Sequence, residues 1–283
     1  MKIIKFMQGE IKYFGIMNGE NEIAKLKYDN VWDIIENIDK IKSNQMFSEF
    51  IIDKNLISIL APIEHPKRNI FCIGKNYIEH AKELTGKPIK EIDGIPNDPI
   101  YFAKVAYPAI GDNGKILLHS DVTDEVDYEV ELGVIISKVC KNVSKENAKE
   151  YIFGYTIIND ITARDLQGKH FQWLRGKSLD TFCPMGPVIV TADEISNHSN
   201  LKISLSVNGE IRQDSNTSKM IFNIEYLISE LSKGMTLMPG DIIATGTPNG
   251  VGMGFTPPKY LKEGDEVICK IENIGELKNI LVK

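Results

Sequence analysis

The stretch Asp127–Ile136 (DYEVELGVII) combines the pattern of a buried β-strand with three carboxylates. Successive strand residues point to opposite faces, so we expect Asp127, Glu129 and Glu131 on one face. The LGVII run that follows lacks polar alternation, which is typical of a strand covered on both faces. Buried like charges repel each other, so a protein cation, a proton or a metal ion must compensate them. The alternative interpretation is a surface strand whose acidic side is solvated.

A second apolar run, residues 151–160 (YIFGYTIIND), ends abruptly in Asn159 and Asp160. An acid at the end of a buried strand is a common way to place a metal ligand or a catalytic group. Two glutamates and one aspartate form an all-oxygen site, which suits Mg²⁺, Mn²⁺ or Ca²⁺ better than zinc or copper. Three carboxylates on a divalent ion would leave open positions for water or a chelating substrate.

The composition is that of an ordinary globular protein of 283 residues, with 42% hydrophobic residues, 25% charged residues and a net charge of −6. No basic patch dominates, so nucleic acid is not an expected partner. The first residues do not form a signal peptide, and no apolar run is long enough to cross a membrane. The four cysteines lie far apart without a CxxC pair, which predicts reduced thiols in a cytoplasmic protein.

Strand patterns dominate the chain. Short alternating segments, a turn at residues 17–21 and a helical stretch at 31–41 predict a small N-terminal β-rich domain over residues 1–62. Two prolines interrupt residues 61–68, and the second domain is expected to span 68–283. Its clearest helices are predicted at 145–152 and 222–234. Many strands with few helices predict a β-rich α+β fold, a sandwich or roll decorated by helices.

Several ordered motifs from about residue 68 to the C-terminus resemble the fumarylacetoacetate hydrolase family: DYEVELGVII, NDITARDLQ, RGKSLDTFCPMGP, the long segment 220–252 and LKEGDEV. The resemblance implies a mixed β-sandwich roll and a homodimer. It also implies a Mg²⁺ or Mn²⁺ ion on Glu129, Glu131 and Asp160, with Ca²⁺ as a substitute in crystals. Asp127 would then orient a ligand or a neighbouring cation.

The segment 74–86 (GKNYIEHAKELTG) has the pattern of a short helix, on which His80 and Glu83 are neighbours. In the acylpyruvate-hydrolase branch of the family, an HxxE at this place serves as a catalytic base dyad, in which Glu83 would orient His80. The alternative is an exposed surface pair. The polar stretch at residues 86–99 is a candidate lid that orders over bound substrate.

Further site residues are implied by the resemblance. Lys177 matches the lysine that the family places beside the metal-bound oxo acid, where its charge would stabilise an enolate oxygen. The alternative is an ordinary surface lysine. Arg164 and Gln167 match positions that contact the substrate or brace the site, although Arg164 could instead form a structural ion pair with Asp165.

The glycine loop at residues 246–252 (GTPNGVG) lacks the GK[ST] of a phosphate-binding loop. In the family this loop offers Thr247 and backbone amides to a substrate carboxylate. Lys104 is a further candidate for substrate binding, but the chain has Val105-Ala106 where many relatives have PS. Cys183 has no neighbouring histidine in the sequence, so we interpret it as a packing residue.

The expected activity is metal-dependent cleavage of a carbon–carbon bond in a small-molecule 2-oxo acid, either a β-diketo or a β-keto acid. Chelation of the acid would stabilise an enolate. Acylpyruvate-type hydrolysis would need water activated by the dyad, whereas oxaloacetate-type decarboxylation would lose CO₂ without an attacking water. Isomerisation or hydration of related dienoates is an alternative, and a non-catalytic, metal-dependent keto-acid-binding protein is a rival from another class.

Overall fold

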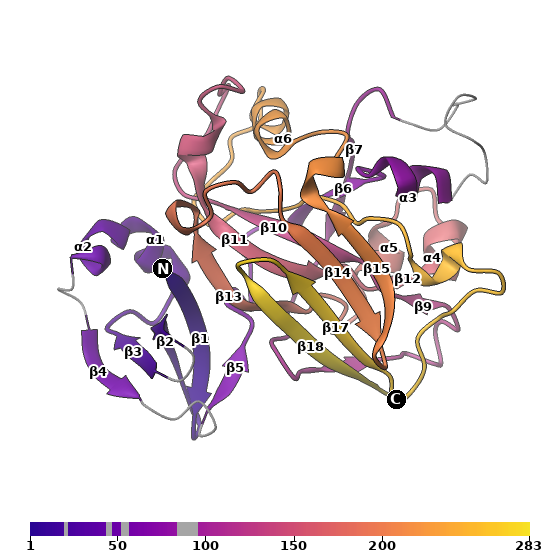
Figure 1. Cartoon of the computed structure of the whole chain (residues 1–283), viewed down its shortest axis with the longest axis horizontal. Coiled ribbons are helices and arrows are strands. Elements are labelled where there is room, and N and C mark those ends of the chain that lie inside the picture. The colour runs from indigo at the N-terminus through magenta and orange to yellow at the C-terminus, as the bar shows by residue number, and fades with distance from the viewer. Residues whose placement is uncertain (20–21, 44–46, 52–56, 84–95) are drawn as a thin grey trace.

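A large mixed sheet runs through the centre of the computed structural model, which describes residues 1–19, 22–43, 47–51, 57–83 and 96–283 (Figure 1). Its order is β4-β3-β2-β1-β13-β11-β10-β16-β6-β7, and β5 pairs with β1. Most neighbours are antiparallel, but β16 and β6 are parallel. The strands are β1 (Lys2–Gln8), β2 (Ile11–Asn18), β3 (Glu22–Leu26), β4 (Phe47–Ile51), β5 (Ser58–Leu60), β6 (Ile70–Gly74), β7 (Ile100–Lys104), β10 (Val130–Ile136), β11 (Ile152–Asn159), β13 (Met185–Thr191) and β16 (Ile242–Ala244).

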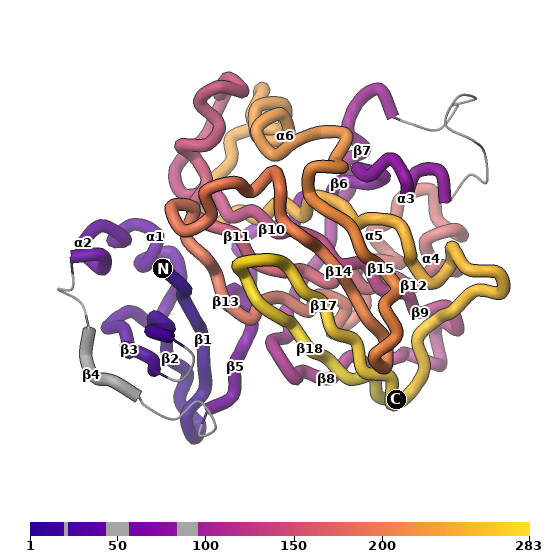
Figure 2. Tube along the Cα trace, in the orientation of Figure 1, coloured from indigo at the N-terminus to yellow at the C-terminus, as the bar shows by residue number. Residues whose placement is uncertain are grey.

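A second sheet packs against the first, with the order β15-β14-β17-β18-β8. Figure 2 shows β18 and β8 side by side, and they pair in parallel. Val130, Leu132 and Val134 of β10 belong to one buried cluster with Ile203 and Leu205 of β14, which places the main core between the sheets. The strands of this sheet are β8 (Lys115–Leu117), β14 (Lys202–Val207), β15 (Glu210–Asn216), β17 (Glu266–Ile271) and β18 (Gly275–Val282).

Helices are short and few in the described residues, which together with the mixed sheets confirms the predicted β-rich α+β roll. None of the described helices combines the length and the apolar character that a membrane span requires. The α-helices are α1 (Val31–Glu36), α2 (Ile38–Lys42), α3 (Ile78–Glu83), α4 (Arg164–Lys169), α5 (Leu174–Lys177) and α6 (Ile224–Leu231), and the 3₁₀ turns are η3 (Ala148–Tyr151), η4 (Ala192–Glu194), η5 (Thr217–Lys219) and η6 (Gly252–Gly254).

Two of the predicted helices differ from the structure in length. The stretch 145–152 forms only the turn η3, because Ile152 already pairs with Ile136 as the first residue of β11. Strand pairing thus overrides the local helix propensity. Helix α6 lies within the predicted 222–234, and the Asn223 side chain caps its first turn by accepting from the Tyr226 amide at 3.0 Å.

The stretch Asp127–Ile136 contributes to two strands and not to one. Asp127 ends the short strand β9 (Val126–Asp127), which pairs with β12 (Thr162–Ala163), and β10 begins at Val130. The Asp127 carboxylate accepts from the Tyr128 amide at 2.8 Å and from the Gly252 amide at 2.6 Å, and these bonds hold the chain at the break. All seven residues of β10 are buried, so the prediction of a strand covered on both faces is confirmed.

The N-terminal segment continues the large sheet, because Lys2 and Ile3 of β1 pair with Val190 and Ile189 of β13. The predicted helix at 31–41 is split into α1 and α2, and the predicted turn at 17–21 lies partly outside the described residues. In the linking segment, Glu64 forms ion pairs with β1 and β2 of the N-terminal segment. The division into domains at residues 62–68 stays a prediction.

Candidate functional site

Three carboxylates converge where β10 begins and β11 ends. Antiparallel pairing of Val130 with Asn159 brings Glu129, just before β10, beside Asp160, just after β11. The Asp160 amide donates to the Glu129 carbonyl at 2.8 Å, which closes the two chain ends together. Glu131 lies one residue into β10. Carboxylate oxygens of all three side chains lie within 4.8 Å of one another, and all three side chains are buried.

Protein cations compensate two of these acids. The Lys177 ammonium lies 2.8 Å from Glu129 Oε2 and 2.7 Å from Asp160 Oδ2. Arg164 Nη1 lies 2.8 Å from Glu129 Oε1. On the far side, the Lys104 ammonium lies 2.7 Å from Asp160 Oδ1. The charge repulsion implied by the sequence is therefore relieved partly by the protein itself.

Glu131 is in a different electrostatic position from Glu129. Burial would raise the pKa of Glu129, but the nearby Lys177 and Arg164 charges outweigh it and lower that pKa to about 2. The pKa of Glu131 is raised well above its usual value by burial and by the negative charges of Asp160 and Glu129. Its carboxylate accepts from the Gly246 amide at 2.8 Å, and no lysine or arginine of the described residues forms an ion pair with it.

The three carboxylates fit a hard divalent cation. They offer oxygen ligands only, and uncompensated repulsion remains at Glu131, which a bound cation would relieve. The buried Glu–Glu–Asp cluster can therefore hold a divalent metal ion, and Glu129, Glu131 and Asp160 are the residues that would hold it.

Asp127 acts on this cluster through Arg164. Its Oδ2 accepts from Arg164 Nε at 2.8 Å, while its Oδ1 accepts from the Gly252 amide. Arg164 is thus fixed against Glu129, as expected for a group that orients a neighbouring cation. Arg164 does not pair with Asp165, the alternative partner: its guanidinium is paired with Asp127 and Glu129, and Asp165 accepts from Thr123 Oγ1 at 2.6 Å.

One donor of Arg164 remains available. Nη1 donates to Gln167 Oε1 at 3.0 Å, whereas the buried Nη2 has no hydrogen-bond partner among the residues that the structure describes. Arg164 and Gln167 both line a cavity above the carboxylates. A buried donor without a partner costs free energy, so a substrate oxygen that accepts from Nη2 would be bound favourably.

His80 and Glu83 of α3 form the expected dyad geometry. His80 Nδ1 lies 3.1 Å from Glu83 Oε2, and Glu83 Oε1 accepts from the Gly250 amide at 2.8 Å. His80 is 4% exposed and lines the cavity, so this is not an exposed surface pair. A carboxylate that accepts from Nδ1–H leaves Nε2 as the proton acceptor. The proposed lid at 86–99 lies mostly outside the described residues.

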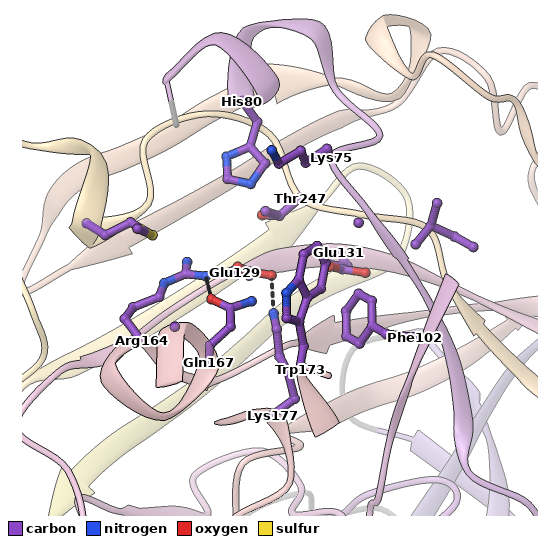
Figure 3. Close-up of a pocket in the computed structure, with 14 residues that line it drawn as sticks. Lys75, His80, Phe102, Glu129, Glu131, Arg164, Gln167, Trp173, Lys177 and Thr247 are labelled. Carbon is purple, nitrogen blue, oxygen red and sulfur yellow. Dashed lines mark hydrogen bonds and ion pairs between the residues drawn. The ribbon is translucent and has the colours of Figure 1, made fainter. Parts of the chain in front are cut away.

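The cavity has a volume of about 240 Å³ (Figure 3). Figure 3 shows His80 and Lys75 on one side of it, and Lys177, Arg164 and Gln167 on the other, with Glu129 and Glu131 between them. Its lining residues are Ile73, Gly74, Lys75, His80, Phe102, Glu129, Glu131, Arg164, Gln167, Gly168, Trp173, Lys177, Thr247 and Met253.

An aromatic wall of Trp173 and Phe102 completes the cavity, with ring centroids 5.1 Å apart. A Cβ atom on Gly74 would lie 2.4 Å from the Trp173 ring, so the indole can cover the end of β6 only because residue 74 is glycine. Sequence reasoning missed this wall. The tryptophan beside the RGKS motif was the available signal.

Thr247, Lys104 and Cys183 are the remaining residues that the sequence singled out, and only Thr247 lines the cavity. Thr247 lines the cavity, donates to the Val130 carbonyl at 2.9 Å and accepts from Gln213 at 2.8 Å. Lys104 is fully buried behind Asp160, donates to the Ile161 carbonyl at 2.9 Å and does not line the cavity. Its role in substrate binding stays a prediction. Cys183 is buried, and burial raises the pKa of its thiol to about 12, in agreement with a packing role.

Comparison with known proteins decides the family. Residues 69–282 match the family model described as the C-terminal region of fumarylacetoacetate (FAA) hydrolase. The chain belongs to the fumarylacetoacetate hydrolase family. It is 50% identical to the oxaloacetate tautomerase YisK of Bacillus subtilis (strain 168) over 238 residues, which cover 84% of this chain and 77% of the relative.

Solved structures of the family agree with the fold. A fumarylacetoacetate hydrolase from psychrophilic Exiguobacterium antarcticum superimposes with a TM-score of 0.85 at 37% identity, over 99% of each chain. A 2-hydroxyhepta-2,4-diene-1,7-dioate isomerase from Mycobacterium marinum gives 0.78 at 31% identity, over 100% of this chain and 98% of the other. The predicted family and fold class are confirmed. The relatives of this family member are named for hydrolase, isomerase and tautomerase activities.

Proposed function

We propose that this protein is a divalent-metal-dependent enzyme that enolises a short 2-oxo acid, with oxaloacetate as the favoured substrate. The main support for this proposal is that His80 lines the same cavity as Glu129 and Glu131 of the buried acidic cluster. Glu83 holds the Nδ1 atom of His80. The 50% identity to a protein named oxaloacetate tautomerase supports the choice of substrate.

Tautomerisation of oxaloacetate moves protons and breaks no bond between heavy atoms. His80 Nε2 takes a proton from C3, because the Glu83 carboxylate retains Nδ1–H and stabilises the imidazolium that forms. The electron pair of the C–H bond shifts to the oxygen at C2, near the Lys177 ammonium that stabilises negative charge there. A proton from His80 or water then converts the enolate to the enol.

A divalent cation on the acidic cluster would polarise the keto group of the substrate and favour the enolate. The protein supplies the remaining parts of the site. Arg164 Nη2 and the Gln167 amide are donors on the same wall as Lys177, and the Trp173–Phe102 pair covers one side of the cavity with apolar surface.

Cleavage of a carbon–carbon bond is the second candidate reaction, supported by the 37% identity to a fumarylacetoacetate hydrolase. In acylpyruvate hydrolysis, His80 would deprotonate a water that adds to the distal carbonyl, and the breaking bond would leave its electron pair on the enolate. In decarboxylation of oxaloacetate, the C3–C4 bond would break, CO₂ would leave and no water would add. Both reactions use the same enolate and the same Lys177 charge.

The test measures the rate of oxaloacetate enolisation from the ultraviolet absorbance of the enol, in the presence of Mg²⁺ or Mn²⁺. A protein-free blank at the same metal concentration gives the rate without the enzyme. Pyruvate formation and acetylpyruvate hydrolysis are assayed on the same preparation. We expect EDTA to abolish the enzymatic rate and Glu131→Gln to lose both the rate and calorimetric Mg²⁺ binding. The matched control Glu276→Gln, at an exposed glutamate of β18, should keep both.

Two results would overturn the proposal. One is an enolisation rate that survives EDTA treatment. The other is unchanged Mg²⁺ affinity in Glu131→Gln, because that variant removes a charge from the cluster while it preserves the shape of the side chain.

A further inference from the structure

Lys75 is a cavity residue to which neither the sequence motifs nor the reaction assigns a role. It follows the last residue of β6, and its side chain is half-buried. Figure 3 shows its ammonium end directed toward His80 near Thr247, across the cavity from Lys177. Lys75 therefore lies on the wall that faces the acidic cluster.

The charge of Lys75 is not neutralised by the residues around it. Lys177 and Arg164 also line the cavity, but both form ion pairs with Glu129. Across the described ranges of the chain, the Lys75 ammonium has no hydrogen bond, ion pair or aromatic ring as a partner. Among the described lysines and arginines that line this cavity, Lys75 is thus the one whose charge no carboxylate compensates.

The backbone holds Lys75 in an uncommon conformation. Its φ of 53° lies in the left-handed region, which few residues other than glycine adopt. The next residue, Asn76, anchors this turn by donating to the Thr245 carbonyl at 2.7 Å and by accepting from the Phe222 amide at 2.8 Å. Backbone strain that the surroundings maintain is a feature of functional sites.

We propose that Lys75 binds the second carboxylate of the substrate and thereby selects four-carbon 2-oxo dicarboxylates over monocarboxylic 2-oxo acids. This inference rests on the proposed function, in which the oxo acid end of the molecule lies at the acidic cluster. The distal carboxylate then points toward the opposite wall, where Lys75 is the unpaired cation. A cavity of about 240 Å³ suits a short molecule that spans both walls.

The activity test compares oxaloacetate with its 4-methyl ester, which lacks the distal charge but keeps the acidic C3 position. Lys75→Met should lower kcat/KM for oxaloacetate by about 10- to 100-fold, which is the range of a charge-assisted hydrogen bond, and should act mainly through KM. The rate with the ester should stay within about twofold of wild type. Equal losses on both substrates would overturn the proposal, because Lys75 would then act on the chemistry or on the fold.

A binding test keeps this proposal separable from the proposed function. Malate and 2-hydroxybutanoate are unreactive and differ in the distal carboxylate, so calorimetry with Mg²⁺ measures the contribution of that group without turnover. Lys75→Met should weaken malate binding by about 10-fold or more and leave 2-hydroxybutanoate binding unchanged. Lys202→Met, at an exposed lysine of β14 outside the cavity lining, is the matched control.

The two proposals fail in different ways. If wild-type protein turns over neither oxaloacetate nor its 4-methyl ester, the enzymatic proposal fails. A selective loss of malate binding in Lys75→Met would still support a carboxylate-binding subsite at Lys75. If Lys75→Met binds malate as tightly as wild type does, the subsite is wrong, whatever the activity.

Discussion

Gly254 limits where the Glu83 carboxylate of the proposed His80–Glu83 dyad can lie. A Cβ atom at residue 254 would lie 2.2 Å from Glu83 Oε1 and 2.4 Å from Glu83 Cδ. Ordinary contact distances are about 3.5 Å, so in Gly254→Ala the Glu83 carboxylate must withdraw by about 1 Å. The residue is exposed on the turn η6 and its φ is not left-handed, so alanine brings no backbone strain.

That displacement should impair catalysis without unfolding the protein. The His80–Glu83 distance of 3.1 Å and the Gly250–Glu83 distance of 2.8 Å would both lengthen beyond hydrogen-bond range. We expect kcat to fall by about 10- to 100-fold, since a positioned base contributes about 10²-fold or more. KM should change little, and the free energy of unfolding should change by less than about 1 kcal/mol.

A double-mutant cycle in steady-state kinetics identifies the cause. If Gly254→Ala acts by moving Glu83, it should add little to the loss already produced by Glu83→Gln. Thermal unfolding of all four proteins is the control for folding. The reasoning is refuted if Gly254→Ala keeps wild-type kcat, or if the two losses multiply in the double variant.

Three further predictions concern the dyad, the N-terminal segment and the assembly. His80→Ala should lower acylpyruvate hydrolysis by about 10²-fold and decarboxylation by less, so the ratio of the two rates should rise; an unchanged ratio in paired assays would contradict the dyad. Burial would raise the pKa of Glu64, but Lys5 and Lys12 outweigh it and lower that pKa below the usual 4.5. The ionised Glu64 therefore stabilises the folded protein above pH 4.5, and this contribution is lost as the pH falls through the lower pKa of the folded state. Glu64→Gln should therefore lose about 1 kcal/mol of unfolding free energy near neutral pH and less in acid, as measured by urea titration. The protein should be a homodimer, and light scattering that shows a monomer at micromolar concentration would reject this.

Local patterns in the sequence were enough to predict the two central strands and the acidic side chains at their ends. Apolar runs identified β10 and β11 as buried strands, and their polar ends marked Glu129, Glu131 and Asp160, because strand periodicity and burial are legible from neighbouring residues. The spacing of His80 and Glu83 placed both on one helical face for the same reason.

Tertiary structure alone decided which charges meet. Asp127 belongs to a separate strand, and its carboxylate pairs with Arg164. Lys104 lies behind Asp160, and Lys75 lines the cavity without an ion pair among the described residues. The contact of Glu83 with the turn at Gly254 joins segments far apart in the chain. Such pairings depend on how sheets and loops fold back on one another and on the direction of each side chain, which sequence spacing does not encode.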